Sequence, residues 1–236
     1  MKSMMLLKRA IAITSTFFLV VGTGAPVFAD IADEQEDAIE EIEESREVFE
    51  EISADSETRI PPALLRDSVG IIILTNVGQG GFIVGGRSGD GLMMVRQDDG
   101  TWSNPAFVTF GGGSFGLQIG GRSSDIVMLI RSQDTVNDIL DGAVEFGGSV
   151  TGTAGPVGET VVDPAESADS NILTYSRSSG LFGGVAVEGG TLSFDEDRNE
   201  AFYNVVNVTP EQILIDSTLS PAASADALEQ ALLAAE

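Results

Sequence analysis

The amino-acid sequence predicts an α+β fold: a single domain with a strongly curved antiparallel β-sheet or barrel-like core and packed helices at its N- and C-terminal ends. Short β-type runs, separated by Gly, Asn, Asp or Ser clusters, recur in the middle of the chain at the spacing of an antiparallel meander. Segments with helical periodicity lie before and after them. Many of the 28 glycines fall inside β-type runs, where glycine commonly marks a bulge or a bend. A ligand slot lined by glycine is the alternative.

Residues 1–29 have the layout of a cleavable secretory signal peptide. Lys2, Lys8 and Arg9 precede a mostly apolar run, and Val27-Phe28-Ala29 ends a segment suited to cleavage after Ala29. A membrane anchor is the alternative, although the run is shorter than the ~20 residues that a span needs. We therefore expect a secreted or periplasmic protein. We do not expect a lipoprotein, because the chain has no cysteine to which a lipid could be attached.

The charge is strongly negative, with 37 acidic against 12 basic residues. Removal of the signal peptide would take away three basic residues and no acids, which leaves 9 basic residues, all arginine, and a net charge of −28. Such a surface repels nucleic acid and gives no long-range attraction to anionic bilayers. We interpret it as adaptation to high salt, where screening shortens charge repulsion to ~3 Å at 1 M.

The segment Asp30–Ser53 has the pattern of an amphipathic acidic helix, to which we assign residues 30–56. Ile42, Phe49 and Ile52 recur on one side, and glutamates fill the other. These three residues either pack against the protein's own domain or form a membrane-contact face; interfacial helices, however, usually carry basic residues on their polar side.

The remaining residues, 57–236, are expected to form the domain with its C-terminal helices. Pro61 and Pro62 end the first helix, and Asp98-Asp99-Gly100 predicts a hairpin turn. Helices are predicted at Ala63–Ser68, Gln133–Leu140, from the Asp195 turn through Tyr203, at Pro210–Ile215 and at Pro221–Ala235, the last with Ser220 as its cap. Strand-like runs are Ile71–Leu74, Phe82–Val84, Leu92–Arg96, Phe107–Phe110, Phe115–Ile119, Ile126–Ile130, Val144–Phe146, Val150–Thr153, Ile172–Tyr175 and Leu181–Glu188, with an exposed acidic loop over Gly158–Ser170.

Motifs for catalysis and cofactor binding are sparse. The chain has neither histidine nor cysteine, so the usual general base, thiol nucleophile and common zinc ligands are absent. Gly111-x-Gly113-x-x-Gly116 matches a dinucleotide pattern, but a strand follows it instead of a helix. Asp195-x-Asp197-x-Asn199 lacks the glycine and closing glutamate of a calcium loop. We therefore expect a protein without enzymatic activity, cofactor or bound metal. A hydrolase built on paired carboxylates is the alternative.

Arg177 stands out because Ser176 and Ser178 flank it and Tyr175 lies just before. A guanidinium among hydroxyl groups is suited to hold a phosphate. The same side chain could instead tie down a turn through backbone carbonyls. The residues alone leave both interpretations open.

Five segments in order resemble the SYLF domain, and together they extend from Ile60 to Tyr203. They are IPPALLRDSVGIIILTNVGQGGFIVGGRSGDGLMMVR, GTWSNPAFVTFGGGSFGLQIGGRSSDIVML, GTAGPVG, YSRSSGLFGGVAVEGG and DEDRNEAFY. The resemblance implies a non-enzymatic, β-rich domain. Eukaryotic relatives bind phosphoinositide-containing membranes with help from an N-terminal amphipathic helix, and some yeast members bind actin. Thr75, Gln79 and Glu159 stand where relatives often have proline, lysine and a basic residue.

Arg87, Arg122 and Arg177 match family positions, so the resemblance makes them the expected lipid or anion contacts, together with Tyr175, Ser176 and Ser178. The expected function is an exported, non-enzymatic lipid- or membrane-binding protein of the cell envelope. The expected partner is a lipid or membrane surface, with envelope proteins as further partners, and neither nucleic acid nor actin. The alternative is a protein-interaction or structural envelope module without lipid specificity. The lipid hypothesis requires the three arginines to converge in space.

Overall fold

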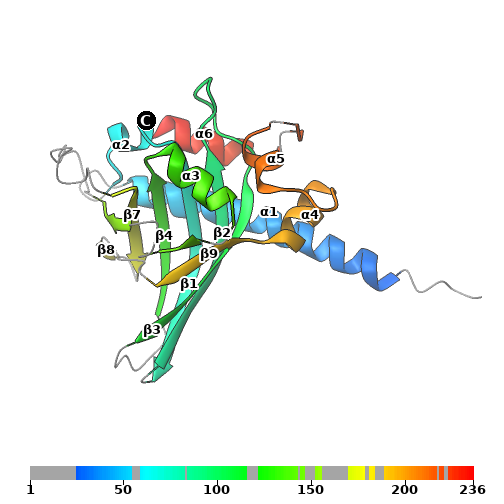
Figure 1. Cartoon of the computed structure of the whole chain (residues 1–236), viewed down its shortest axis with the longest axis horizontal. Coiled ribbons are helices and arrows are strands. Elements are labelled where there is room, and N and C mark those ends of the chain that lie inside the picture. Colours follow the sequence, from blue (N-terminus) through cyan, green and yellow to red (C-terminus); the bar gives the residue numbers. More distant parts are fainter. Residues whose placement is uncertain are drawn as a thin grey trace, which may run out of the picture.

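The computed structural model describes residues 25–54, 59–82, 84–115, 122–142, 144–146, 152–155, 170–178, 181–183, 189–216, 218–220 and 223–236. In these residues, nine strands form one curved sheet, and six α-helices pack around it (Figure 1). The strands are β1 Gly70–Phe82, β2 Val84–Val95, β3 Ala106–Phe115, β4 Arg122–Ile130, β5 Val144–Glu145, β6 Gly152–Ala154, β7 Ile172–Ser178, β8 Leu181–Gly183 and β9 Gly190–Phe194. The helices are α1 Ala25–Ala54, α2 Pro62–Arg66, α3 Gln133–Leu140, α4 Glu196–Tyr203, α5 Pro210–Leu214 and α6 Asp226–Ala234.

The strands follow the order β5-β9-β3-β2-β1-β4-β7-β6, with β8 paired to β7. All of these pairings are antiparallel except that of β6 with β7, which is parallel. Helices from both ends of the chain lie against the sheet (Figure 1). The predicted α+β fold with a curved, mainly antiparallel sheet is confirmed.

Both faces of the sheet are buried where helices cover them. Ile71 and Ile73 of β1 join an apolar cluster with residues of α1, α2 and α6. Ile72 and Leu74 point to the other face and join a cluster with α3, α5, β5 and β9, because successive strand residues face opposite sides. The continuous apolar runs of β1 and β4 therefore reflect burial on two faces.

Strands β1 to β3 are longer than the sequence predicts. Of the predicted run Phe82–Val84, Phe82 ends β1 and Val84 begins β2, and the two pair with each other across the hairpin. The glycine-rich segments between the apolar runs were expected to separate strands, but in the structure they continue the ladder. The free ends of β1, β2 and β3 extend past the helices (Figure 1). We call the part of β1 to β4 beyond the row of Thr75, Asp90 and Thr109 the ribbon end.

Glycine is required for packing at some strand positions and not at others. A Cβ atom on Gly91 would lie 2.0 Å from the carbonyl oxygen of Ile73. At Gly111 and Gly113, by contrast, an added Cβ atom would meet no atom within 4 Å. The close approach of the neighbouring backbone therefore explains Gly91 in the covered part of the sheet. It does not explain Gly111 and Gly113 in the ribbon end.

Several local predictions are confirmed. Helix α3 has the predicted bounds, and the side chain of Ser132 caps its N-terminus. The amide of Gly100 donates to the carbonyl of Gln97 (2.9 Å), which closes the predicted turn between β2 and β3. The Asp195 side chain caps α4 through the amide of Arg198, so this segment is a helix start, as the sequence indicates.

Other local predictions need correction. Helix α6 begins at Asp226 with Ala225 as its N-cap, so Ser220 is not its cap. Strand β9 has no counterpart among the predicted strands. Most of the predicted loop 158–170, the second part of the predicted run 181–188 and residues 1–24 of the predicted signal peptide lie outside the described residues. In the described part of the chain, no helix has both the length and the apolar character to cross a bilayer.

Candidate functional site

Arg177 is held between two carboxylates. Strand β7 pairs with β4 so that Arg177 lies opposite Asp125, and its Nη2 and Nε atoms donate to Oδ2 of Asp125 at 2.9 and 3.2 Å. The guanidinium also forms an ion pair with Glu51 of α1. Arg177 therefore ties α1 to the sheet, and two anionic groups already engage it. Its expected role as a lipid or anion contact stays a prediction.

The residues beside Arg177 face inward. Tyr175 and Ser176 are buried, with 3% and 5% of their surface exposed. Burial raises the pKa of the Tyr175 phenol above its ordinary range, because the anionic form loses water. Neither residue is open to a head group from outside in this structure, and their role as lipid or anion contacts stays a prediction. The side chain of Ser178 lies outside the described residues.

The predicted membrane-contact residues are in the core. Ile42, Phe49 and Ile52 of α1 are each 1% exposed or less and pack in the cluster below α1 and α6. The first of the two interpretations, packing against the protein's own domain, therefore describes this structure. Membrane contact through these side chains would require α1 to leave the sheet.

Arg87 and Arg122 lie together, apart from Arg177. Gln79 of β1 pairs with Arg87 of β2 on one side and with Arg122 of β4 on the other, so the three positions form one cross-strand row in the ribbon end. The Arg87 guanidinium lies over the ring of Phe110, 5.9 Å from its centroid, on the face opposite α1. Their role as anion contacts remains a prediction, but the three predicted arginines do not converge on one site.

A bulge in β1 separates the covered sheet from the ribbon end. The pairing shifts between Leu74 and Val77, and Asn76 has a left-handed backbone with φ of 50°. The backbone amide of Asn76 donates to Oδ1 of Asp125 (3.1 Å), and the Thr75 hydroxyl donates to Oε1 of Glu41 in α1 (2.9 Å). Two carboxylates from distant segments thus hold the bulge.

Glu41 is a buried acid, only 8% exposed. Desolvation raises its carboxyl pKa above the ordinary value of 4.5, and the hydrogen bond from Thr75 opposes this shift. Neither Glu41 nor Asp125 was among the residues that the sequence pattern marked. A local signal was present for Asp125, because Gly-Gly-Arg-Ser followed by an aspartate three residues after the arginine occurs twice, at Arg87 and at Arg122.

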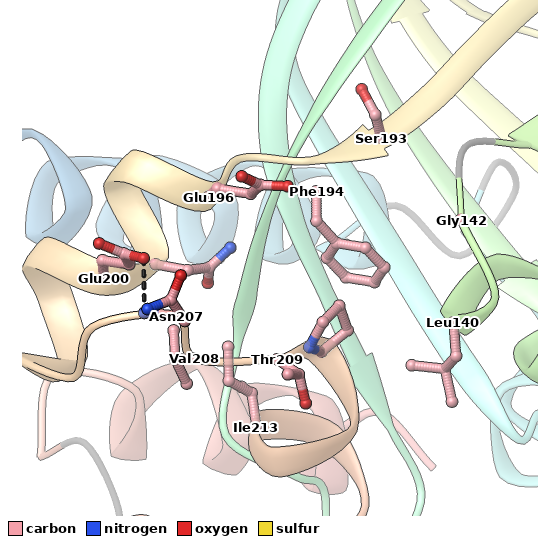
Figure 2. A pocket seen from close by; sticks show the side chains of 12 residues that line it. Leu140, Gly142, Ser193, Phe194, Glu196, Glu200, Asn207, Val208, Thr209 and Ile213 are labelled. Atoms are coloured by element: carbon pink, nitrogen blue, oxygen red, sulfur yellow. Dashed lines mark hydrogen bonds between the residues drawn. The ribbon is translucent and has the colours of Figure 1, made fainter.

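A cavity of about 490 Å³ lies between β9, α4, α5 and the end of α3 (Figure 2). Apolar residues such as Phe194 and Ile213 line it together with Glu196, Asn199 and Glu200. The carboxylate of Glu200 accepts a hydrogen bond from the amide of Asn207 (2.6 Å). The side chain of Asn199 accepts a hydrogen bond from the backbone amide of Phe107 and donates one to the carbonyl of Phe107. This side chain therefore holds α4 to β3.

Arg96 is a further structural arginine that the sequence analysis did not single out. Its guanidinium lies 4.2 Å from the ring centroid of Trp102 and donates to Oε1 of Glu236 (2.8 Å) and to the carbonyl of Leu65 (3.0 Å). It joins α2, the end of β2 and the segment after α6. Among the described residues, no group of three or more acidic side chains is arranged to hold a metal ion.

Residues 111–235, more than half of the chain, match a family model described as Ysc84, "Las17-binding protein actin regulator". The chain is 34% identical over 160 residues to LAS seventeen-binding protein 3 of Saccharomyces cerevisiae, which covers 66% of this chain and 34% of that protein. It is 29% identical over 187 residues to SH3 domain-containing YSC84-like protein 1 of Homo sapiens, which covers 78% of this chain and 54% of that protein. The chain thus spans about a third to a half of these relatives.

The expectation that actin is not a partner finds no support in these comparisons, because the description of the matched family itself names actin regulation. The predicted resemblance to the SYLF domain is confirmed by the same match and by the relatives named YSC84-like. By sequence over more than half of its length, this chain belongs to the Ysc84 (SYLF) family.

Proposed function

We propose that this protein is an exported, non-enzymatic member of its family that binds a membrane surface of the cell envelope through its ribbon end. The single observation that carries this proposal is the position of Arg87 and Arg122, which share one cross-strand row beyond the helix-covered sheet. Residues 1–29 would serve as the secretory signal.

The distribution of charge supports the ribbon end as the contact surface. Residues 68–89 and 100–124 contain no acidic side chain, although the chain as a whole has 37. Strands β1 to β4 therefore carry no carboxylate beyond the row of Asp90, and Asp125 lies next to the bulge. In this region a membrane surface would meet two arginines without nearby acidic residues in the same strands.

Long-range attraction cannot drive the contact, because the whole protein repels an anionic surface. Binding then depends on short-range contacts of the arginines with head groups and on burial of apolar surface, worth ~25 cal/mol per Å². We expect added salt to spare or strengthen binding, because screening weakens the overall repulsion more than these close contacts.

The test is vesicle flotation of the protein lacking residues 1–29, with phosphatidylethanolamine and phosphatidylglycerol vesicles at low salt and at 1 M salt. We expect flotation at both, and a severalfold loss in the variant Arg87→Gln/Arg122→Gln. The matched control is Arg46→Gln/Arg66→Gln, which changes net charge equally at residues outside the ribbon end. Failure of the parent protein to float, or binding that disappears as salt rises, would contradict the proposal.

A protein-interaction role is the second candidate, and the family description favours it. Cosedimentation of the same protein with filamentous actin tests this directly. A protein that pellets with actin in proportion to filament concentration, and that does not float with vesicles, would support the second candidate over the first.

A further inference from the structure

The last row of the ribbon end is apolar on three adjacent strands. Phe82 ends β1 and pairs with Val84 at the start of β2, and Val84 pairs with Phe115 at the end of β3. These positions lie at the ends of the strands that extend farthest from the helices (Figure 1). We call Phe82, Val84 and Phe115 the tip row.

Only small residues separate the tip row from Arg87 in β2 and β3. The intervening rows pair Gly85 with Ser114 and Gly86 with Gly113. Arg87 follows Val84 by three residues, which corresponds to roughly 10 Å along a strand. Along β2 and β3, the apolar tip row is thus followed by two rows of glycine and serine and then by the row of Arg87.

This spacing fits the boundary between the acyl chains and the head groups of a bilayer. Apolar groups of interfacial proteins enter this boundary to a depth of about 5–10 Å, while arginine keeps its charged group at the level of the phosphates. A membrane also fits the charge of the region, because arginines are the only charged residues that β1 to β4 carry beyond the bulge.

We infer that the tip row of Phe82, Val84 and Phe115 inserts into the acyl region of a membrane while Arg87 and Arg122 remain at the head groups. This inference rests on the proposed membrane binding and adds the residues that enter the bilayer. It assigns insertion to strand ends and leaves α1 docked on the sheet.

The experiment uses the absence of cysteine from the chain. A single cysteine is introduced as Val84→Cys and labelled with a polarity-sensitive fluorophore. The matched control is Val206→Cys, at a residue that is 78% exposed in the turn after α4. Both proteins are mixed with phosphatidylethanolamine and phosphatidylglycerol vesicles, with and without lipids brominated along the acyl chains.

We expect a blue shift and quenching by brominated lipid at position 84 and neither change at position 206. Flotation of Phe82→Ser/Phe115→Ser should fall on the order of tenfold or more, since two apolar side chains no longer leave water. Thermal melting checks that this variant folds, and the labelled proteins give an answer without it.

The outcomes separate the two proposals. If the labelled proteins do not float, the proposed function fails and the inference with it. If they float but the label at position 84 reports water, insertion of the tip row is wrong and membrane binding stands. A shift at position 84 that depends on protein concentration and not on vesicles would overturn the inference in favour of contact with a second copy of the chain.

Discussion

The two ends of strands β1 to β3 differ in what surrounds them. In the covered part, Ile73 and Phe107 are fully buried, and helices or other strands lie on both faces. In the ribbon end, Ser88 and Gly113 are exposed, and the residues nearest the end are glycine and serine up to the tip row. The same ladder of backbone hydrogen bonds runs through both parts.

This difference shows that strand pairing does not need a packed face at every row. The covered part has most of the buried apolar side chains, and of the ribbon end Val77 and Phe110, next to the boundary row, join the core. Beyond them the ribbon end continues the ladder outward. Substitutions should therefore have large effects on folding in one part and small ones in the other.

Phe107→Ala should lower the free energy of unfolding by about 3–5 kcal/mol, because a large core side chain is lost and a cavity remains. Phe107 is fully buried and contacts the ring of Phe202 edge to face, with centroids 5.1 Å apart. Urea denaturation followed by circular dichroism measures the change. Ser88→Ala in the ribbon end is the control and should stay within about 0.5 kcal/mol. Equal effects at the two sites would contradict the contrast.

Gly91→Ala should destabilise the protein by roughly 1–3 kcal/mol or more, because the new Cβ atom would collide with the carbonyl of Ile73. Gly111→Ala is the matched change in the ribbon end, where the added methyl group meets open space. We expect it to be neutral or to stabilise by about 0.4–1 kcal/mol through lower entropy of the unfolded chain. Thermal melting of both variants checks the prediction, and a destabilised Gly111→Ala would show that the ribbon end is packed after all.

Asp125→Ala should cost about 2 kcal/mol, since it leaves the Asn76 amide and the Arg177 guanidinium without this acceptor. Asp90→Ala is the matched control, because Asp90 follows Arg87 by three residues just as Asp125 follows Arg122. Asp90 is exposed, and we expect a change within about 0.5 kcal/mol. Similar losses for both aspartates in urea denaturation would argue against a special role of Asp125 at the bulge.

Glu41→Gln should produce the smallest effect, within about 1 kcal/mol, and one that depends on pH. Burial raises the pKa of Glu41, so the folded protein keeps this proton to a higher pH than the unfolded chain does. Relative to the variant, the parent protein should gain stability as pH falls toward 4.5 and lose it as pH rises through the folded-state pKa. A difference between the two proteins that does not vary with pH would contradict this account.

Local sequence patterns predicted a helix correctly where all the residues that determine it lie within one short segment. The serine cap and apolar spacing of α3 lie within one short stretch, and so does the Asp195 cap of α4. Strand β9 and the start of α6 were not predicted. β9 pairs with β3 and β5, and this pairing joins segments distant in the chain.

The candidate site shows the same division. The sequence marked Arg87, Arg122 and Arg177 as equivalent, and the repeated Gly-Gly-Arg-Ser pattern relates the first two. The register of β1 places these two in one row, whereas Arg177 meets Asp125 and Glu51 from other elements. Which carboxylate reaches an arginine depends on strand register and helix docking, and a local pattern does not contain that information.

Residue identity and short-range order were enough to establish the family, the α+β class, the excess of acidic residues and the acid-free segments. Only in the folded structure does α1 bury Ile42, Phe49 and Ile52, and only there do Arg87 and Arg122 share a row apart from Arg177. The physical reason is that burial and ion pairing are set by contacts between segments far apart in the chain, and these contacts exist only once the sheet has formed and the helix has docked on it.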